Sequence, residues 1–204
     1  MCEEINAMIR TNTLSLVPPT SSMNIVGCRW VFRLKRDSNG NVTRRRARLV
    51  AKGNHQLSGI DFTETFSPVI KTATIHTILS IVVSFNWPLR QIDIQNAFLH
   101  GTLDETVYMV QPPGFVDERY PNYACKLHKS LYGLKQAPRA WFNCLQEFLL
   151  SYGFLQSKAD TSLFVFSRAA LSSRFVTRDL GDFNFFLGIE AVKHSDGALL
   201  LSQK

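Results

Sequence analysis

The residues with the clearest chemical signature are the cations between positions 29 and 52. This segment holds nine basic residues and one acid, Asp37, so it carries a net charge of +8 while the rest of the chain sums to −1. Such a patch predicts binding to a polyanion: nucleic acid, nucleotide phosphates or an anionic membrane surface. A solvated charged face is the alternative, although neighbouring arginines repel each other without an anionic partner. The cations are Arg29, Arg33, Lys35, Arg36, Arg44, Arg45, Arg46, Arg48 and Lys52.

Thiol and metal chemistry have weaker support in the sequence. The four cysteines and five histidines form no pairs at the spacing of zinc ligands. We therefore interpret the cysteines as reduced thiols that are mostly buried, since a free cysteine usually packs as a small apolar side chain. The cysteines are Cys2, Cys28, Cys125 and Cys144.

The bulk composition is that of a folded protein. A chain of 204 residues, of which 45% are hydrophobic, is long enough for one core or two small lobes. Ser84 and Asn86 interrupt the longest apolar run, and the first ten residues lack the apolar centre of a signal peptide. We expect a soluble, intracellular protein, either cytoplasmic or nuclear, with no membrane partner.

The elements that must position the basic residues can be predicted from periodicity. Apolar and basic residues alternate from 30 to 35, as in a β-strand, and Asn39-Gly40 is a strong signal for a tight turn. Residues 42–52 then return as a second strand. The prediction is a hairpin with one aromatic face and one arginine face.

The rest of the chain predicts a mixture of helices and hairpins, and therefore an α+β fold. Residues 72–86 have helical periodicity, and we expect Thr72 or Thr74 to cap this helix. The other predicted elements are a loop or strand edge at 14–19, a loop at 64–68, a strand at 89–94, a turn at 96–101, a helix from Pro138 to Tyr152 with Gly153 as its cap, and a hairpin of 183–192 and 198–202.

Seven motifs follow one another along nearly the whole chain. They are RARLVAKG (46–53), ETFSPV (64–69), QIDIQNAFLHG (91–101), VYMVQPPGF (107–115), SLYGLKQAPRAW (130–141), DTSLF (160–164) and DLGDFNFFLGIE (179–190). Together they resemble the reverse transcriptase domain, an RNA-directed DNA polymerase, in the Pol polyprotein of copia-type LTR retrotransposons. The resemblance implies the fingers and part of the palm of a right-hand polymerase, with antiparallel hairpins packed on helices.

The resemblance also implies roles for individual residues. In this family two divalent cations, Mg²⁺ by resemblance, help to join a primer to a deoxynucleotide on an RNA or DNA template. Asp93 matches a catalytic, metal-binding aspartate, and Phe98 matches the aromatic gate against a ribose 2′-hydroxyl. The remaining matches are nucleotide binding by Arg46, Arg48, Lys52 and Gln136, and nucleic-acid binding by Arg33, Lys35, Arg44 and Arg45.

Each of these assignments has a structural alternative. Considered alone, Asp93 is typical of a turn or cap residue and Phe98 is typical of a core residue. Gln136 is as compatible with a structural role at the entrance of its helix as with a nucleotide contact. Only the joint placement of Asp93 and Phe98 in one long motif favours descent from an active site.

The departures from the family pattern concern the catalytic palm hairpin. The family has a Tyr-x-Asp-Asp turn after the DTSLF motif, whereas this chain contains no Asp-Asp pair. The sequence predicts that a few dozen residues are missing at a join within 167–170. We expect residues 1–168 to form the fingers and first part of the palm and residues 169–204 to form a later palm segment, with the thumb and ribonuclease H domains absent.

The missing turn predicts a truncated pseudoenzyme in which Asp93 is the only remaining catalytic residue and Mg²⁺ binding is lost. Asp179 and Asp182 match a non-catalytic segment of the family and are not expected to replace the lost pair. We also expect the strand at 89–94 to lose its neighbour, unless residues 183–202 replace it, and to be prone to aggregation. Two other readings remain open: a gene-model error in an active element, and a non-catalytic nucleic-acid-binding module that uses the hairpin 29–52.

Overall fold

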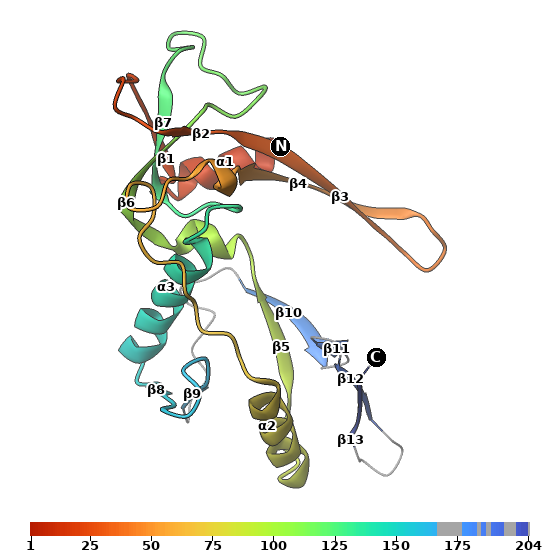
Figure 1. Ribbon diagram of the computed structural model, residues 1–204. Coiled ribbons are helices and arrows are strands. Elements are labelled where there is room, and N and C mark those ends of the chain that lie inside the picture. The colour runs from red at the N-terminus through yellow and green to blue at the C-terminus, as the bar shows by residue number, and fades with distance from the viewer. Residues whose placement is uncertain (167–176, 183–184, 187–188, 194–198, 204) are drawn as a thin grey trace. The chain divides into compact units, whose positions relative to one another are not determined.

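The computed structural model describes residues 1–166, 177–182, 185–186, 189–193 and 199–203. The chain divides into two compact units, Met1–Ser67 with Asn96–Phe148, and Pro68–Gln95 with Leu149–Lys204. Both units combine helical and strand segments, which confirms the mixed α and β class (Figure 1). In the described part of the chain, every helix is too short or too polar to cross a membrane.

The first unit contains a four-stranded sheet with the strand order β1-β7-β6-β2. Strands β1 and β6 pair antiparallel with β7, whereas β2 runs parallel to β6. Residues 14–17 form β1 at the edge of the sheet and residues 18–19 lie outside it, so the predicted range 14–19 contains both a strand edge and a loop. The strands are β1 (Leu14–Val17), β2 (Ile25–Val26), β6 (Thr102–Met109) and β7 (Ala124–Lys129).

Helices and loops enclose one apolar core in this unit. The helical segments are α1 (Cys2–Arg10), the short η1 (Gly53–His55) and η2 (Ala97–His100), and α3 (Ala137–Ser151). Met8, Met109 and Leu127 belong to the core and are almost completely buried. Burial of each such side chain contributes roughly 1.5–3 kcal/mol to folding. Helix α1 was not predicted from the sequence, whereas α3 was.

A long antiparallel hairpin is also part of the first unit. It pairs β3 (Cys28–Arg36) with β4 (Val42–Ala51), and the register places Trp30 opposite Leu49. Gly40 has a φ of +85° at the turn, a conformation that glycine adopts at little cost. The Asp37 carboxylate accepts hydrogen bonds from the backbone N–H groups of Asn39 and Asn41. The predicted hairpin and its turn are therefore confirmed.

The described residues of the second unit form helix α2, the end of α3 and three small sheets. Strand β5 pairs with β10, β8 pairs with β9, and β12 pairs with both β11 and β13. The β12–β13 pairing confirms part of the predicted terminal hairpin, whose turn at 195–197 lies outside the described residues. The elements are α2 (Thr72–Ser84), β5 (Arg90–Ile94), β8 (Leu155–Gln156), β9 (Phe164–Val165), β10 (Thr177–Asp182), β11 (Phe185–Phe186), β12 (Ile189–Lys193) and β13 (Leu199–Gln203).

The beginning of α2 is capped differently from the sequence prediction. The N-cap position is Lys71, and the helix has no side-chain cap from Thr72 or Thr74. Instead the carboxylate of Asp160 accepts hydrogen bonds from the Lys71 backbone N–H, at 3.2 Å, and from the Thr74 hydroxyl, at 2.6 Å. The prediction of a local threonine cap was wrong. The backbone N–H at the N-cap position donates its hydrogen bond to Asp160, which lies in a distant loop.

The expectation that the strand at 89–94 has no neighbour was also wrong. Strand β10 pairs antiparallel with β5, so residues 177–182 supply a partner for the backbone around Asp93. The replacement comes from residues 177–182 and not from the 183–202 hairpin. The register pairs Arg178 with Asp93 and Asp179 with Ile92.

Candidate nucleic-acid interface

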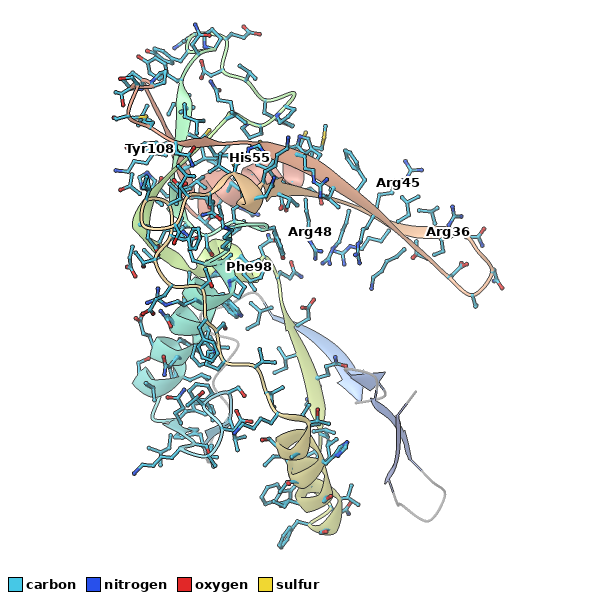
Figure 2. The ribbon with its side chains drawn as sticks, in the orientation of Figure 1. Arg36, Arg45, Arg48, His55, Phe98 and Tyr108 are labelled. Carbon is cyan, nitrogen blue, oxygen red and sulfur yellow. The ribbon has the colours of Figure 1, made fainter. Side chains whose placement is uncertain are left out.

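The register of β3 and β4 sorts the hairpin cations onto two faces. Residues directly opposite each other in an antiparallel pair project from the same face, and successive residues alternate between faces. Arg45 belongs to the aromatic face, opposite Leu34, and Figure 2 labels Arg45 and Arg48 on opposite sides of the ribbon. The basic face, as paired by the register, comprises Arg29, Arg33, Lys35, Arg44, Arg46 and Arg48.

The basic face brings like charges directly opposite each other. Arg33 is paired with Arg46, and Lys35 is paired with Arg44. Such pairs destabilise a sheet unless an anion lies between them. Asp37, the one acid of the hairpin sequence, uses its carboxylate to bind the turn. The geometry of this face therefore suits a ligand with several negative charges.

Arg48 connects the basic face to an aromatic pair. Its guanidinium lies over the ring of Tyr132, 4.8 Å from the ring centroid. The Tyr132 ring in turn meets Phe98 edge-on, with centroids 4.8 Å apart. A cation over an aromatic face is attracted by the electrons of the ring. The three side chains form a continuous surface at the base of the hairpin, where Phe98 packs partly against the core.

The loop that carries Tyr132 is fixed against β4 by close backbone contact. The Ala51 N–H donates a 2.7 Å hydrogen bond to the Tyr132 carbonyl oxygen. The next residue, Gly133, has a φ of +90°, and a Cβ atom there would lie 2.1 Å from the Ala51 carbonyl oxygen. Only glycine fits this contact, so the position of Tyr132 under Arg48 depends on Gly133.

Gln136 lies in the interior and not at the surface. Its side-chain oxygen accepts a 2.9 Å hydrogen bond from Gln56, and its amide nitrogen donates a 2.7 Å hydrogen bond to the Asp61 carbonyl oxygen. Gln56 also accepts a hydrogen bond from the Lys135 N–H. This placement matches the structural alternative that the sequence left open, and a nucleotide contact by Gln136 stays a prediction.

Lys52 follows β4 and is exposed. Its side-chain stem packs close to Gly27, and its backbone N–H donates to the Gly27 carbonyl oxygen at 2.8 Å. Lys52 therefore lies just beyond the end of β4.

Of the nucleotide-binding residues predicted from the sequence, Phe98 is joined to the basic face through Tyr132 and Arg48, whereas Gln136 is buried. Tyr132 was missed by the sequence analysis, although it stands within the SLYGLKQAPRAW motif.

Asp93 belongs to the second unit, where it is exposed on β5. Its register partner on β10 is Arg178, and the nearest acid on that strand, Asp179, is paired with Ile92. In the ranges that the structure describes, no three His, Cys, Asp or Glu side chains gather as metal ligands would.

The buried thiols do not have the properties of nucleophiles. Burial raises the pKa of the Cys125 thiol to about 12, with a smaller contribution from Cys28. Burial also raises the pKa of Cys28, although Lys52 acts in the opposite direction. Because the thiolate is the reactive form, both side chains remain protonated and inert at neutral pH.

The chain belongs to the family described as reverse transcriptase (RNA-dependent DNA polymerase), whose sequence pattern matches residues 11–170. This match, together with the relatives described next, confirms the resemblance to a copia-type retrotransposon reverse transcriptase domain.

The relatives are retrotransposon polyproteins. Over 233 aligned positions that include the whole chain, the sequence is 48% identical to the retrovirus-related Pol polyproteins from transposons RE1 and RE2 of Arabidopsis thaliana. It is 43% identical over 164 positions, or 80% of the chain, to the retrovirus-related Pol polyprotein from transposon TNT 1-94 of Nicotiana tabacum. The chain spans 16% of the length of the two Arabidopsis relatives and 12% of the tobacco relative.

Proposed function

We propose that this chain is a non-catalytic remnant of a retrotransposon reverse transcriptase, which retains the phosphate-binding face of the fingers and lacks the metal centre of the palm. The observation that carries the proposal is the pairing of β5 with β10, in which Arg178 is the register partner of Asp93. The register thus places an arginine, and not an acid, opposite the one remaining catalytic aspartate in the strand pair.

The residues around Asp93 do not fit the two Mg²⁺ ions that the family implies. Two such ions bring four positive charges into one site, about 4 Å apart, and their mutual repulsion requires several carboxylates. Asp93 supplies one carboxylate, and the register places Asp179 opposite Ile92 and not opposite Asp93. We derive no polymerisation step for this donor set.

The comparison with relatives supports an internal deletion. An alignment of 233 positions that contains all 204 residues includes about 29 positions at which this chain has no residue. The family pattern stops matching at residue 170, beside the join that the sequence predicts at 167–170. A loss of this size is large enough to remove a β-hairpin. An exon wrongly removed from the gene model would produce the same gap in the alignment. Sequencing of full-length transcripts across Arg168–Ala169 distinguishes a true deletion from such an error.

Primer extension tests the loss of chemistry. The purified protein should not extend a primed RNA or DNA template in the presence of Mg²⁺ or Mn²⁺. Template-dependent incorporation that disappears in Asp93→Asn would overturn the proposal. Because Asp93 is exposed on its strand, this substitution is not expected to disturb folding.

The basic face favours residual binding of nucleic acid, the second part of the proposal. Such binding should be weak, with a Kd of roughly 10⁻⁴–10⁻⁶ M at physiological salt, and should not depend on base sequence. The supporting observation is the facing of Arg33 with Arg46 and of Lys35 with Arg44. These unfavourable pairs are relieved when a phosphate lies between them.

The salt dependence of oligonucleotide binding tests which face is used. Replacing Arg44, Arg46 and Arg48 by Ala should reduce the slope of log K against log salt by about 2, because each lost phosphate contact on a single strand removes about 0.7. Arg45→Ala is the matched control, since Arg45 lies opposite Leu34 on the aromatic face. An unchanged slope in the triple variant would show that the hairpin is not the binding surface.

A further inference from the structure

Tyr132 is the middle member of a row of three side chains in the first unit. The Arg48 guanidinium lies 4.8 Å from the centroid of its ring, and the Phe98 ring meets the same ring edge-on at 4.8 Å. All three side chains are half-buried. Arg48 belongs to the basic face of the hairpin, whereas Phe98 belongs to η2. Tyr132 therefore connects the basic face to a segment that is distant in sequence.

The loop that carries the Tyr132 ring is anchored on both sides. Before the ring, the Ser130 N–H donates a 2.7 Å hydrogen bond to the Gly101 carbonyl oxygen, and the Ser130 hydroxyl donates to the Phe98 carbonyl oxygen. On the other side, the Tyr132 carbonyl oxygen accepts a 2.7 Å hydrogen bond from the Ala51 N–H. The loop is thus tied to the end of η2 and to the end of β4. These contacts lie within the protein, so the ring is held in place without a ligand.

A ring that is held in this way leaves Arg48 able to bind phosphate. The electrons of the ring attract the guanidinium, while a phosphate accepts hydrogen bonds from the N–H groups of the guanidinium. The two interactions use different parts of the group and can be made together. An arginine side chain has much rotamer freedom, and a contact that restricts it in advance reduces the entropy lost when a phosphate binds.

We propose that Tyr132 is a positioning residue, which holds the Arg48 guanidinium in place for a phosphate group of single-stranded nucleic acid. This inference rests on the phosphate binding proposed above for the basic face, and it assigns a role to a residue outside the hairpin. The role requires the aromatic ring of Tyr132, because the ring is the part that Arg48 contacts. A phenylalanine should therefore replace the tyrosine, whereas a leucine should not.

Oligonucleotide binding by two variants tests the need for the ring. The probe is a fluorescent single-stranded oligonucleotide, titrated by anisotropy at low salt. Tyr132→Leu should weaken binding about threefold to tenfold, because it removes the ring and keeps only an apolar side chain next to Arg48. Tyr132→Phe should bind within about twofold of the wild type, because its ring still attracts the guanidinium.

Phe62→Leu is the matched control, since the first unit contains a second contact of the same kind. The Lys135 ammonium lies 4.4 Å from the centroid of the Phe62 ring, and this ring is also half-buried. Neither residue belongs to the basic face. The control should change the affinity less than about twofold, because the contact that it removes does not involve Arg48. Equal losses in Phe62→Leu and Tyr132→Leu would overturn the role of Tyr132.

A double-mutant cycle with Arg48→Ala tests whether Tyr132 acts through Arg48. In that background, Tyr132→Leu should have no further effect on the affinity. A loss of the same size in both backgrounds would overturn the positioning role, and so would an unchanged affinity of Tyr132→Leu alone. No binding by the wild type would overturn the proposed phosphate binding and this inference with it.

A spectroscopic measurement on the unmodified chain does not depend on the folding of a variant. The ring current of an aromatic side chain shifts the NMR signals of protons that lie over its face to lower frequency. The side-chain protons of Arg48 should show this shift before nucleic acid is added, and the oligonucleotide should then change the Arg48 N–H signals while the ring-current shift remains. Arg48 signals at the frequencies of exposed arginines in the free protein would contradict the proposal.

Discussion

The two units of the chain differ in how completely their elements are covered. In the first unit, buried apolar residues from α1, the hairpin, the sheet and the Tyr132 loop join in one core cluster. In the described part of the second unit, the apolar cluster holds only Ile75 and Leu79 as buried residues. The difference lies in this buried core and not in exposed apolar side chains, since Phe66 of the first unit is 80% exposed and Leu155 of the second is 73% exposed.

This difference shows which elements tolerate the proposed loss of a neighbouring segment. The β3–β4 hairpin brings both of its strands and its turn within one stretch of sequence, so its pairing needs no distant partner. Strand β5 depends on a strand that is far away in sequence, and it pairs with β10. We therefore expect the β3–β4 hairpin to form whether or not a distant segment is lost. We expect the packing around β5 to depend on segments that are distant in sequence.

The largest expected effect is the loss of the loop–strand contact in the first unit. Gly133→Ala would place a Cβ atom 2.1 Å from the Ala51 carbonyl oxygen at a φ of +90°. Clash and backbone strain together should lower the free energy of unfolding by about 2–5 kcal/mol. Chemical denaturation followed by Trp30 fluorescence, in a background with Trp87 and Trp141 replaced by Phe, measures the change.

Gly114→Ala separates strain from clash. Gly114 has a φ of +81°, but nothing lies within 4 Å of a Cβ atom built there. This control should cost only about 1–2 kcal/mol. Equal losses in the two variants would mean that the contact between Gly133 and Ala51 does not hold the loop.

The second prediction compares one kind of truncation in the two units. Leu131 is fully buried, so Leu131→Ala should cost about 2–5 kcal/mol through lost contacts and a cavity. Ile92 is 47% exposed, and Ile92→Ala should cost less than about 1 kcal/mol. Denaturant titration of both variants measures the ratio. A larger loss at Ile92 than at Leu131 would show that the second unit is as well packed as the first.

The third prediction tests the pairing of β5 with β10. Asp179→Pro introduces a residue without an N–H group next to Ile92 in the register, and proline is poorly tolerated inside a paired strand. Because successive N–H groups of a strand point to opposite edges, amide hydrogen exchange should accelerate about tenfold at whichever of Ile92 and Asp93 donates toward β10, the equivalent of roughly 1.4 kcal/mol. Exchange in the β3–β4 hairpin should not change. Rapid exchange of residues 90–94 in the wild type would instead indicate that β5 lacks a stable partner.

The smallest expected effect concerns the tertiary cap of α2. Hydrogen bonds from the Ser162 and Thr74 hydroxyls and from backbone N–H groups hold the pKa of Asp160 well below its usual value. Because the folded-state pKa is depressed, this stabilisation is complete above the unfolded-state pKa of about 3.9 and is lost as the pH falls below it. The protection factors of amides in the first turn of α2, which are corrected for the slower intrinsic exchange in acid, should therefore fall on acidification.

Asp160→Asn should give the faster exchange already at neutral pH and should remove the acid-dependent step. Asp104→Asn, at an exposed position in β6, is the control and should leave α2 unchanged. If acidification lowers the protection factors in the first turn of α2 equally in the wild type and in Asp160→Asn, the Asp160 carboxylate is not the cap.

The sequence by itself determined the family and those helices and strands that form from contacts between residues close together in the chain. The alternation of apolar and basic residues and the Asn39-Gly40 turn gave both the hairpin and its two faces, because side-chain direction in a strand follows from parity alone. Helical periodicity gave α2 and α3 to within about two residues. The seven motifs predicted the reverse transcriptase family, which residues 11–170 match.

Only the tertiary structure decided the contacts between distant segments. The carboxylate of Asp160 caps a helix that begins nearly ninety residues earlier, and Gln136 is buried by Gln56 and Asp61. Tyr132 meets Arg48 because Gly133 allows two backbones to touch. None of these partners is specified by periodicity, since each depends on where separate elements meet in space. For the same reason the pairing of β10 with β5 was not indicated by the local sequence.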